Sequence, residues 1–287
     1  SGCVALHLAL QTQTWLSSLA ALSGLKNGSI SWKPHLEKAG ETLQKNLEHV
    51  DLGDFFTAVD DEARARLRTF SHGVNRYQEA PREPRPPEPP VFWQDGTTRV
   101  LDYGTGAEDA RPVLVVPSLI NRGYILDLTE RNSLMRHLAR DGFRPFLVDW
   151  GAPGRQEREF DLTAYVCWRL EPVADEIFDA TGRAPALIGY CMGGRQVRAV
   201  AGHLPNFRAT MSLHGTNLVT EKDDSPHLLA GKMQGEVYCG FAQMDAFAPP
   251  KLVAAMERAF KGAGAQYRFN VHAGADHGYA LPERDIH

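Results

Sequence analysis

Apolar residues recur at spacings of three and four along the first 78 residues, which is the period of an amphipathic helix. Charged and polar residues separate them, as on a solvated helix face. The apolar stripes contain Trp15, Leu16, Leu19 and Leu22, then Leu36, Leu43, Leu47 and Val50, then Phe56, Val59, Ala63, Leu67, Phe70, Val74 and Tyr77. The pattern predicts an N-terminal helical region at residues 1–79. We expect these helices to pack on a larger body, and a surface that contacts lipid or a partner protein is the alternative.

A proline-rich segment follows the helical region. Six prolines stand within the ten residues PREPRPPEPP. Because proline lacks the backbone N–H that a helix or a central strand needs, the segment predicts a stiff linker. We therefore expect a linker at 80–91 between the helical region and a second domain at 92–287. A polyproline II segment lying on that domain would have the same composition.

From residue 92 onward, short apolar runs alternate with longer amphipathic segments. Asp95-Gly96 between two strand-like runs predicts a β-hairpin. Further strands are expected at 113–116, 146–148, 186–188, 209–213, 236–239 and 267–271, and helices at 133–140, 162–178, after Met192 and at 252–260. Strands that alternate with helices form parallel crossovers. The pattern therefore predicts a doubly wound, mostly parallel α/β sheet.

Composition narrows the function classes. The 31 basic and 35 acidic residues are interspersed and give a formal charge of -4, so nucleic acid is not an expected partner. The four cysteines lack CxxC spacing and nearby histidines at zinc-finger intervals, so we expect no metal or other cofactor and a cytoplasmic setting.

No apolar run approaches the roughly 18 residues of a membrane span. The start at Ser1, without Met and without the basic start of a secretion signal, leads us to expect a truncation or a cloning remnant and leaves an upstream signal open.

The strongest chemical signal is the segment GYCMGG at 189–194, which lies between a predicted strand and a predicted helix. This is the context of a nucleophile elbow with cysteine in place of serine. Glycines are needed there because a sharp strand-to-helix turn leaves no room for side chains. We expect the turn to lift Cys191 above the carboxyl edge of the sheet, beside a helix N-terminus. A buried structural cysteine in a tight turn is the alternative.

An acid and a histidine follow the elbow in the chain order that this kind of site uses. Asp245 comes just past the 236–239 strand, whereas its rivals Asp223 and Asp224 lie in a polar loop. His277 follows the last strand on a glycine-flanked loop, whereas His272 lies within or at the end of that strand and is expected to be structural. The sequence therefore predicts a Cys-His-Asp triad.

Two backbone amides are predicted to be the oxyanion donors. One is the amide of Met192, directly after Cys191, and the other is the amide of Leu119, in the loop after the first long strand. Asn121, Arg122 and Tyr190 are candidate substrate-binding residues, with capping and salt bridging as alternatives for the first two. Attack by the thiolate on a carbonyl would leave a thioester on the cysteine, which water hydrolyses or a hydroxyl group accepts.

Two family resemblances meet in this chain. Residues from about 70 to 190 resemble polyhydroxyalkanoate synthases, on the motifs PSLINRGYILDL at 117–128 and DWGAPG at 149–154. Residues from about 189 to 287 resemble the dienelactone hydrolase family, on SLHG at 212–215, SPHLL at 225–229 and GADHGY at 274–279. The change of resemblance at the elbow fits a natural recombination, an engineered chimera or a divergent branch that keeps features of both families.

Both resemblances imply the α/β-hydrolase fold with Cys191, Asp245 and His277 as the triad, but they imply different reactions. The synthases polymerise hydroxyacyl groups from coenzyme A thioesters and carry a large cap between nucleophile and acid, whereas dienelactone hydrolases open small lactones with water. Here only 54 positions lead from the nucleophile to the acid. We therefore expect no large cap and favour a hydrolase of small esters or lactones.

Two alternatives stay open. One is a synthase-like acyltransferase that takes an acyl-thioester substrate, with the helical region serving a homodimer or contact with a polymer granule. The other is an inactive scaffold or interaction protein that keeps the fold.

Overall fold

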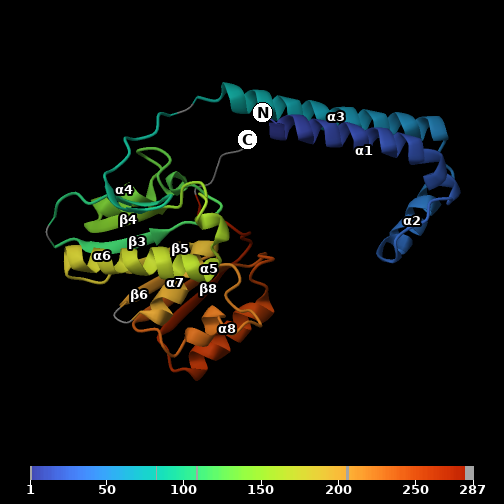
Figure 1. Ribbon diagram of the computed structural model, residues 1–287. Helices are drawn as coiled ribbons and strands as arrows, with labels where there is room; N and C mark the ends of the chain where they lie inside the picture. Colours follow the sequence, from blue (N-terminus) through green and yellow to red (C-terminus); the bar gives the residue numbers. More distant parts are fainter. Residues whose placement is uncertain (1, 82, 108, 205–206, 282–287) are drawn as a thin grey trace. The chain divides into compact units, whose positions relative to one another are not determined.

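The computed structural model describes residues 2–81, 83–107, 109–204 and 207–281. The chain forms two compact units, Ser1–Arg82 and Glu83–His287, so the division falls within the proline-rich segment. Figure 1 shows helices alone in the first unit and a sheet with flanking helices in the second.

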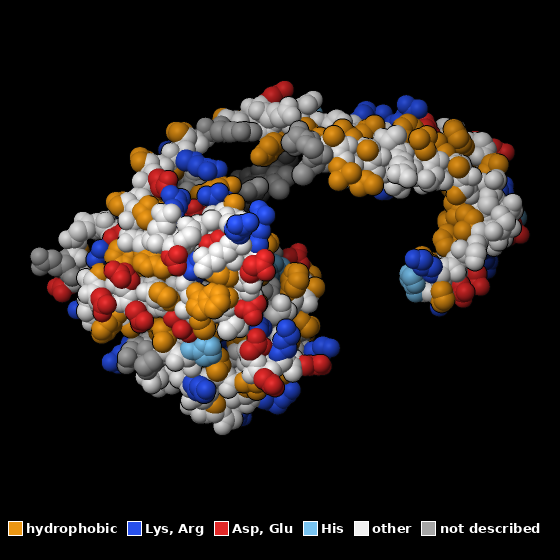
Figure 2. All heavy atoms as spheres, in the orientation of Figure 1, with side chains coloured by type: hydrophobic (Ala, Val, Ile, Leu, Met, Phe, Trp, Pro, Cys, Tyr) orange, Lys and Arg blue, Asp and Glu red, His pale blue; other side chains and the backbone are white. Residues whose placement is uncertain are grey.

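The first unit consists of helices, as its apolar stripes predicted. They are α1 (Gly2–Asn27), α2 (Glu37–Leu47) and α3 (Leu52–Glu79), with a short 3₁₀ turn at Pro34–Leu36. α3 begins at an Asp51 cap, whose carboxylate accepts hydrogen bonds from the backbone N–H groups of Gly53 and Asp54. Many apolar side chains of this unit remain exposed (Figure 2). Leu10 and Phe56 are among them. Within the described ranges, no helix combines the length and the apolar character needed to cross a membrane.

The second unit is built on an eight-stranded sheet with the order β1-β2-β4-β3-β5-β6-β7-β8. β1 and β2 pair antiparallel with each other and β2 pairs antiparallel with β4, whereas the remaining neighbours are parallel. The strands are β1 (Val91–Asp95), β2 (Thr98–Asp102), β3 (Arg111–Val116), β4 (Phe143–Asp149), β5 (Ala186–Tyr190), β6 (Ala209–Leu213), β7 (Glu236–Ala242) and β8 (Tyr267–His272). The doubly wound, mostly parallel sheet predicted from the sequence is confirmed.

Helices cover both faces of this sheet. They are α4 (Leu134–Arg140), α5 (Leu162–Tyr165), α6 (Glu171–Thr181), α7 (Met192–His203) and α8 (Pro250–Gly262). Side chains alternate along each strand, so Leu114 and Val116 join the buried cluster that includes residues of α6, α7 and α8. Val113 and Val115 point the other way and pack with Met135 of α4. Burial on both faces explains why the central strands read as continuous apolar runs.

Two local expectations need correction. The hairpin turn was expected at Asp95-Gly96, but Asp95 pairs with Thr98, so Gly96 and Thr97 form the turn and Gly96 has a φ of +57°. The single helix expected at 162–178 is interrupted by a π-helical turn at Val166–Leu170. Pro172 follows this turn, and its ring has no N–H to donate to the preceding helix.

The proline-rich segment contacts the second unit. The guanidinium of Arg136 donates to the backbone carbonyl of Pro87 at 3.1 Å. Glu88 forms an ion pair with Arg99 of β2 at 2.7 Å. Pro87 and Glu88 therefore lie on the sheet domain, as the polyproline alternative would require.

The chain between Cys191 and Asp245 is compact. In the described part of this stretch, α7, β6, the 3₁₀ turn Pro226–Leu229 and β7 are the regular elements. No large cap is therefore inserted there among the described residues, as the short spacing predicted.

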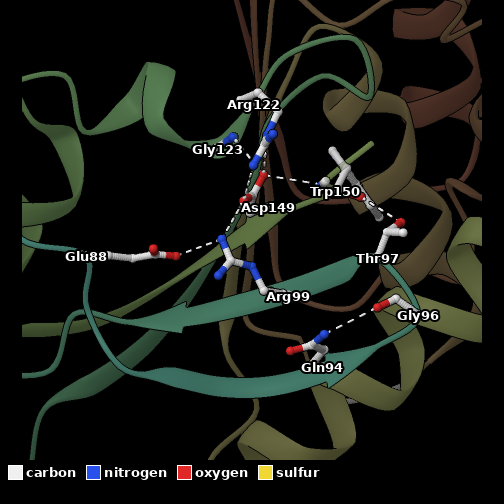
Figure 3. A network of polar contacts seen from close by, with 10 residues as sticks. Glu88, Gln94, Gly96, Thr97, Arg99, Arg122, Gly123, Asp149 and Trp150 are labelled. Carbon is white, nitrogen blue, oxygen red and sulfur yellow. Dashed lines mark hydrogen bonds and ion pairs between the residues drawn. The ribbon is translucent and has the colours of Figure 1, made fainter. Parts of the chain in front are cut away.

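One buried carboxylate ties several of these elements together. Asp149, at the end of β4, accepts hydrogen bonds from Arg99 of β2, from Arg122 in the loop after β3, and from the backbone amide of Gly123 (Figure 3). It also accepts one from the backbone amide of Gly151. Burial alone would raise the pKa of this carboxyl group, but these hydrogen bonds outweigh burial and lower the pKa to about 2. The ionised form of Asp149 therefore stabilises the folded state.

We expect Asp149→Asn to lower the free energy of unfolding by about 2 kcal/mol at pH 7, measured by chemical denaturation. The folded-state pKa lies below that of the unfolded chain. The stabilisation is therefore complete above about pH 4 and is lost as the pH falls through about 2, so the difference between wild type and variant should shrink below about pH 4. The control is Asp141→Asn, in an exposed pair with His137, which should cost less than about 1 kcal/mol. Equal effects of the two substitutions would contradict this account.

Candidate active site

The turn between β5 and α7 holds Cys191 in an unusual backbone conformation. Its φ is 54° and its ψ is -117°, a region that residues other than glycine rarely adopt. The neighbouring chain after β6 holds the turn in place. The backbone N–H of Cys191 donates to the carbonyl of Leu213 at 3.0 Å, and the N–H of Thr216 donates to the Cys191 carbonyl at 3.2 Å.

The glycines around Cys191 are there because backbone segments meet closely, as the sequence indicated. A Cβ atom on Gly193 would collide with the backbone carbonyl of Val116 at the end of β3. A Cβ atom on Gly189 would collide with the carbonyl of Gly193, and one on Gly194 with the hydroxyl of Ser212. Only glycine allows this approach between strand and helix.

Three side chains predicted to act together lie in a row at the carboxyl edge of the sheet. Nε2 of His277 lies 3.2 Å from Sγ of Cys191, and Nδ1 of His277 lies 2.8 Å from Oδ2 of Asp245. The Asp245 side chain is fully buried, and its other oxygen accepts the backbone N–H of Phe247 at 2.8 Å. These residues follow β5, β7 and β8, whose parallel carboxyl ends meet at one edge. A carboxylate thus orients an imidazole toward a thiol.

A cavity of about 340 Å³ opens beside Cys191. Met192, a lining residue, is the first residue of α7, where a backbone N–H has no partner inside the helix. Leu119 packs its side chain against the core, while its neighbours Ser118 and Ile120 line the cavity. Both amides predicted as oxyanion donors therefore belong to segments that border the cavity.

The candidate substrate residues separate into two groups. Asn121 and the buried Tyr190 line the cavity. Arg122 does not line it, because its guanidinium binds Asp149 (Figure 3). The substrate-binding role predicted for Arg122 does not fit this placement, whereas the salt-bridging alternative does. Together with the hydrogen bond from Trp150 Nε1 to the Pro117 carbonyl, the Asp149 network holds the loop that carries Leu119.

His214 also belongs to this site, although the sequence reasoning gave it no role. It follows β6, is 1% exposed, and lines the cavity with its ring centre 4.9 Å from that of His277. Burial, together with the charge of a protonated His277, lowers the pKa of His214 to about 4, so its ring is neutral near pH 7. Its position after the strand next to β5 was a usable signal, because adjacent parallel strands end at the same edge.

Matches to family models divide the chain much as its motifs do. Residues 179–287 match the dienelactone hydrolase family, and residues 89–138 match the N-terminus of poly-beta-hydroxybutyrate polymerase (PhaC). Both resemblances stated from the motifs are confirmed.

Curated relatives repeat the polymerase resemblance. A poly(3-hydroxyalkanoate) polymerase subunit PhaC from Haloferax mediterranei is 33% identical over 160 residues, which cover 55% of this chain and 32% of the relative. Poly(3-hydroxyalkanoate) polymerase 2 from Ectopseudomonas oleovorans is 40% identical over 117 residues, which cover 40% of this chain and 21% of the relative. The matches thus span about a third or less of the length of these relatives.

Solved structures repeat the hydrolase resemblance at the level of the fold. A candidate dienelactone hydrolase from Klebsiella pneumoniae superposes with a TM-score of 0.53 at 19% identity, over 70% of this chain and 92% of that one. A dienelactone hydrolase-like promiscuous phosphotriesterase from metagenomic libraries gives a TM-score of 0.50 at 22% identity, over 67% and 83% of the two chains. The chain therefore has the α/β-hydrolase fold and joins a segment similar to PhaC polymerases to a segment similar to dienelactone hydrolases.

Proposed function

We propose that this enzyme hydrolyses small esters or lactones, with Cys191 as nucleophile, His277 as general base and Asp245 as the residue that orients the histidine. One observation carries the proposal. The His277 ring lies between the Cys191 thiol, at 3.2 Å, and the buried Asp245 carboxylate, at 2.8 Å. Both distances suit proton transfer to an imidazole whose orientation and tautomer are held by a carboxylate.

The first half of the reaction forms a thioester. His277 Nε2 takes the proton of the Cys191 thiol, and the thiolate attacks the ester carbonyl. The backbone N–H groups of Met192 and Leu119 stabilise the negative charge on the carbonyl oxygen. When this intermediate collapses, the C–O bond to the alcohol breaks, and the departing oxygen takes the proton from His277. Asp245 stabilises the imidazolium that exists between these two transfers.

The second half releases the acid. Water enters the cavity, and His277 removes one of its protons while the oxygen attacks the thioester carbonyl. The same two amides stabilise the second oxyanion. Its collapse breaks the C–S bond, and the Cys191 sulfur leaves as a thiolate that recovers the proton from His277. The enzyme returns to its starting state with no net change in its own atoms.

The shape of the cavity supports a small substrate. Its volume of about 340 Å³ lies at the low end of the range for ligand pockets. Apolar residues such as Ile125, Leu126 and Phe247 contribute much of the wall and suit a short acyl or lactone group. The described chain between Cys191 and Asp245 carries no large cap, so water can reach the thioester.

Acyl transfer is the second candidate, and one observation favours it. The match to the PhaC N-terminus at 89–138 includes Asn121, Ile125 and Leu126, which line the cavity. A wall similar to that of polymerases suits an acyl group delivered as a thioester. The chemistry differs from hydrolysis only in the second step, where a substrate hydroxyl replaces water.

Replacing the nucleophile tests the reaction most directly. We expect Cys191→Ala to lower kcat/KM for p-nitrophenyl acetate by at least about 1,000-fold, and His277→Ala by a similar factor, because the two groups act as a unit. Cys167→Ala is the matched control, since Cys167 lies outside the cavity lining, and it should keep wild-type activity. Full activity of the Cys191 variant would overturn the proposal.

Alkylation identifies the reactive thiol independently of turnover. Iodoacetamide should label Cys191 well before Cys167 and Cys239, as followed by mass spectrometry of digested protein. Burial raises the pKa of the Cys239 thiol to about 11, and burial also raises the pKa of Cys167, so neither is a thiolate near pH 7. First labelling of Cys167, with activity retained, would contradict the assignment.

The choice of acyl acceptor separates the two candidate functions. Hydrolysis predicts turnover of p-nitrophenyl acetate, and from 3-hydroxybutyryl-CoA it predicts at most free acid, detected by chromatography. Acyl transfer predicts release of CoA with formation of oligomers, detected by mass spectrometry. No turnover of either compound, with a folded protein by circular dichroism, would instead support the inactive scaffold.

A further inference from the structure

Three atoms that can act as metal ligands lie close together beside the turn that carries Cys191. The sulfur of Cys191 and one ring nitrogen each of His214 and His277 all lie within 4.8 Å of one another. The proposed hydrolysis uses only the first and the third of these groups. The position of His214 therefore needs a separate explanation.

His214 is a buried polar group whose ring nitrogens bind no other residue in the described part of the chain. It is 1% exposed, and neither Nδ1 nor Nε2 has a hydrogen-bond partner in any other residue that the structure describes. Leaving such a group unpaired destabilises the fold. The rings around it are those of Tyr190, Tyr279 and His277, and no carboxylate is among these ring contacts. An imidazole in its neutral form has one nitrogen lone pair that can bind a cation.

His277 is paired with a carboxylate, as metal-binding histidines commonly are. Asp245 accepts the hydrogen of Nδ1, which leaves the lone pair of Nε2 directed at the Cys191 sulfur. Carboxylate–histidine pairs of this kind orient metal-binding histidines and raise their basicity. The Asp245 side chain is fully buried, so the orientation of the ring is well held.

The spacing of the three donors suits a tetrahedral Zn²⁺. Zn–N bonds of about 2.0 Å and Zn–S bonds of about 2.3 Å at a tetrahedral angle place nitrogen and sulfur ligands about 3.5 Å apart. The sulfur of Cys191 and Nε2 of His277 are 3.2 Å apart, and no separation within the trio exceeds 4.8 Å. The separation between Cys191 and His277 is therefore close to that of two ligands on a tetrahedral Zn²⁺. One thiolate and two imidazoles favour a soft or borderline cation over Mg²⁺ or Ca²⁺.

We propose that Cys191, His214 and His277 bind Zn²⁺, and that the bound ion reversibly blocks the active site. Binding forms one Zn–S and two Zn–N bonds and releases the thiol proton to solvent. The ion then occupies the sulfur lone pair needed for attack and the Nε2 lone pair needed to accept a proton. The metal site rests on geometry alone, whereas the inhibition rests on the proposed function.

A second cluster in the chain provides a built-in comparison. Donor atoms of Cys167, Glu171 and His203 also lie within 4.8 Å of one another. There, however, Nδ1 of His203 already pairs with Glu171 at 3.3 Å, and the His203 side chain is 40% exposed. This cluster lacks a buried, unpaired donor, so we expect it to bind Zn²⁺ more weakly.

The test is titration of the full chain with ZnCl₂ by calorimetry, and with Co²⁺ as a spectroscopic probe. We expect one tight site per chain and a thiolate-to-Co²⁺ absorption band that Cys191→Ala removes. His214→Phe and His214→Asn should each weaken Zn²⁺ binding at least about 10-fold, whereas Cys167→Ala should leave it unchanged. Circular dichroism checks that each variant is folded. If His214→Phe does not fold, His214→Asn provides the test.

Blocking of the site has its own measurement. Stoichiometric Zn²⁺ should protect Cys191 from iodoacetamide and stop ester turnover. EDTA should restore both the alkylation of Cys191 and the ester turnover. Loss of tight binding in Cys167→Ala, unchanged affinity in folded His214 variants, or no tight site at all would each overturn the metal site. Tight binding that depends on His214, in a protein without ester turnover, would support the metal site and refute the proposed hydrolase.

Discussion

The whole site depends on the close contact between backbone segments at the turn after β5. Gly193 lies against the end of β3, and Gly189 and Gly194 allow β5 and α7 to meet at a sharp angle. This packing holds Cys191 at a positive φ, a conformation that costs energy and persists only when the surroundings enforce it. The sulfur is thereby presented at the carboxyl edge of the sheet, where the loops after β7 and β8 bring Asp245 and His277.

Two buried aspartates, Asp245 and Asp149, have different roles because they have different hydrogen-bond partners. Asp245 is enclosed and stays paired with His277, so it orients the ring. Asp149 is also enclosed, but its partners are Arg99, Arg122 and backbone amides, so it acts on structure and holds the loop that borders the cavity. The same residue type thus serves two purposes because its neighbours differ.

The two family resemblances meet in one cavity. The polymerase-like segment supplies the loop after β3 and its apolar wall, whereas the hydrolase-like segment supplies the acid, the histidine and His214. The order of strands explains why they join there, since β3 lies beside β5 and β6 follows on the other side. A chain assembled from two kinds of segment can therefore form a single site at the elbow.

The sequence alone determined the parallel sheet, the elbow and the choice of Asp245 and His277. Buried parallel strands must be apolar on both faces, a sharp turn between strand and helix requires glycine, and polar residues after such strands gather at one edge. The sequence also contained Pro172, which follows the π-helical turn at Val166–Leu170, but amphipathic periodicity alone predicted one continuous helix there.

Only the tertiary structure decided which side chains enter the cavity. Asn121 and Arg122 are neighbours in the chain, yet one lines the cavity and the other binds Asp149, a residue of a strand far along the sequence. His214 became part of the site because three rings and the end of β6 enclose it. Such outcomes depend on distances between residues remote in sequence. The position of His214 after a strand was a signal in the sequence, but only the strand order of the folded sheet places that strand beside β5.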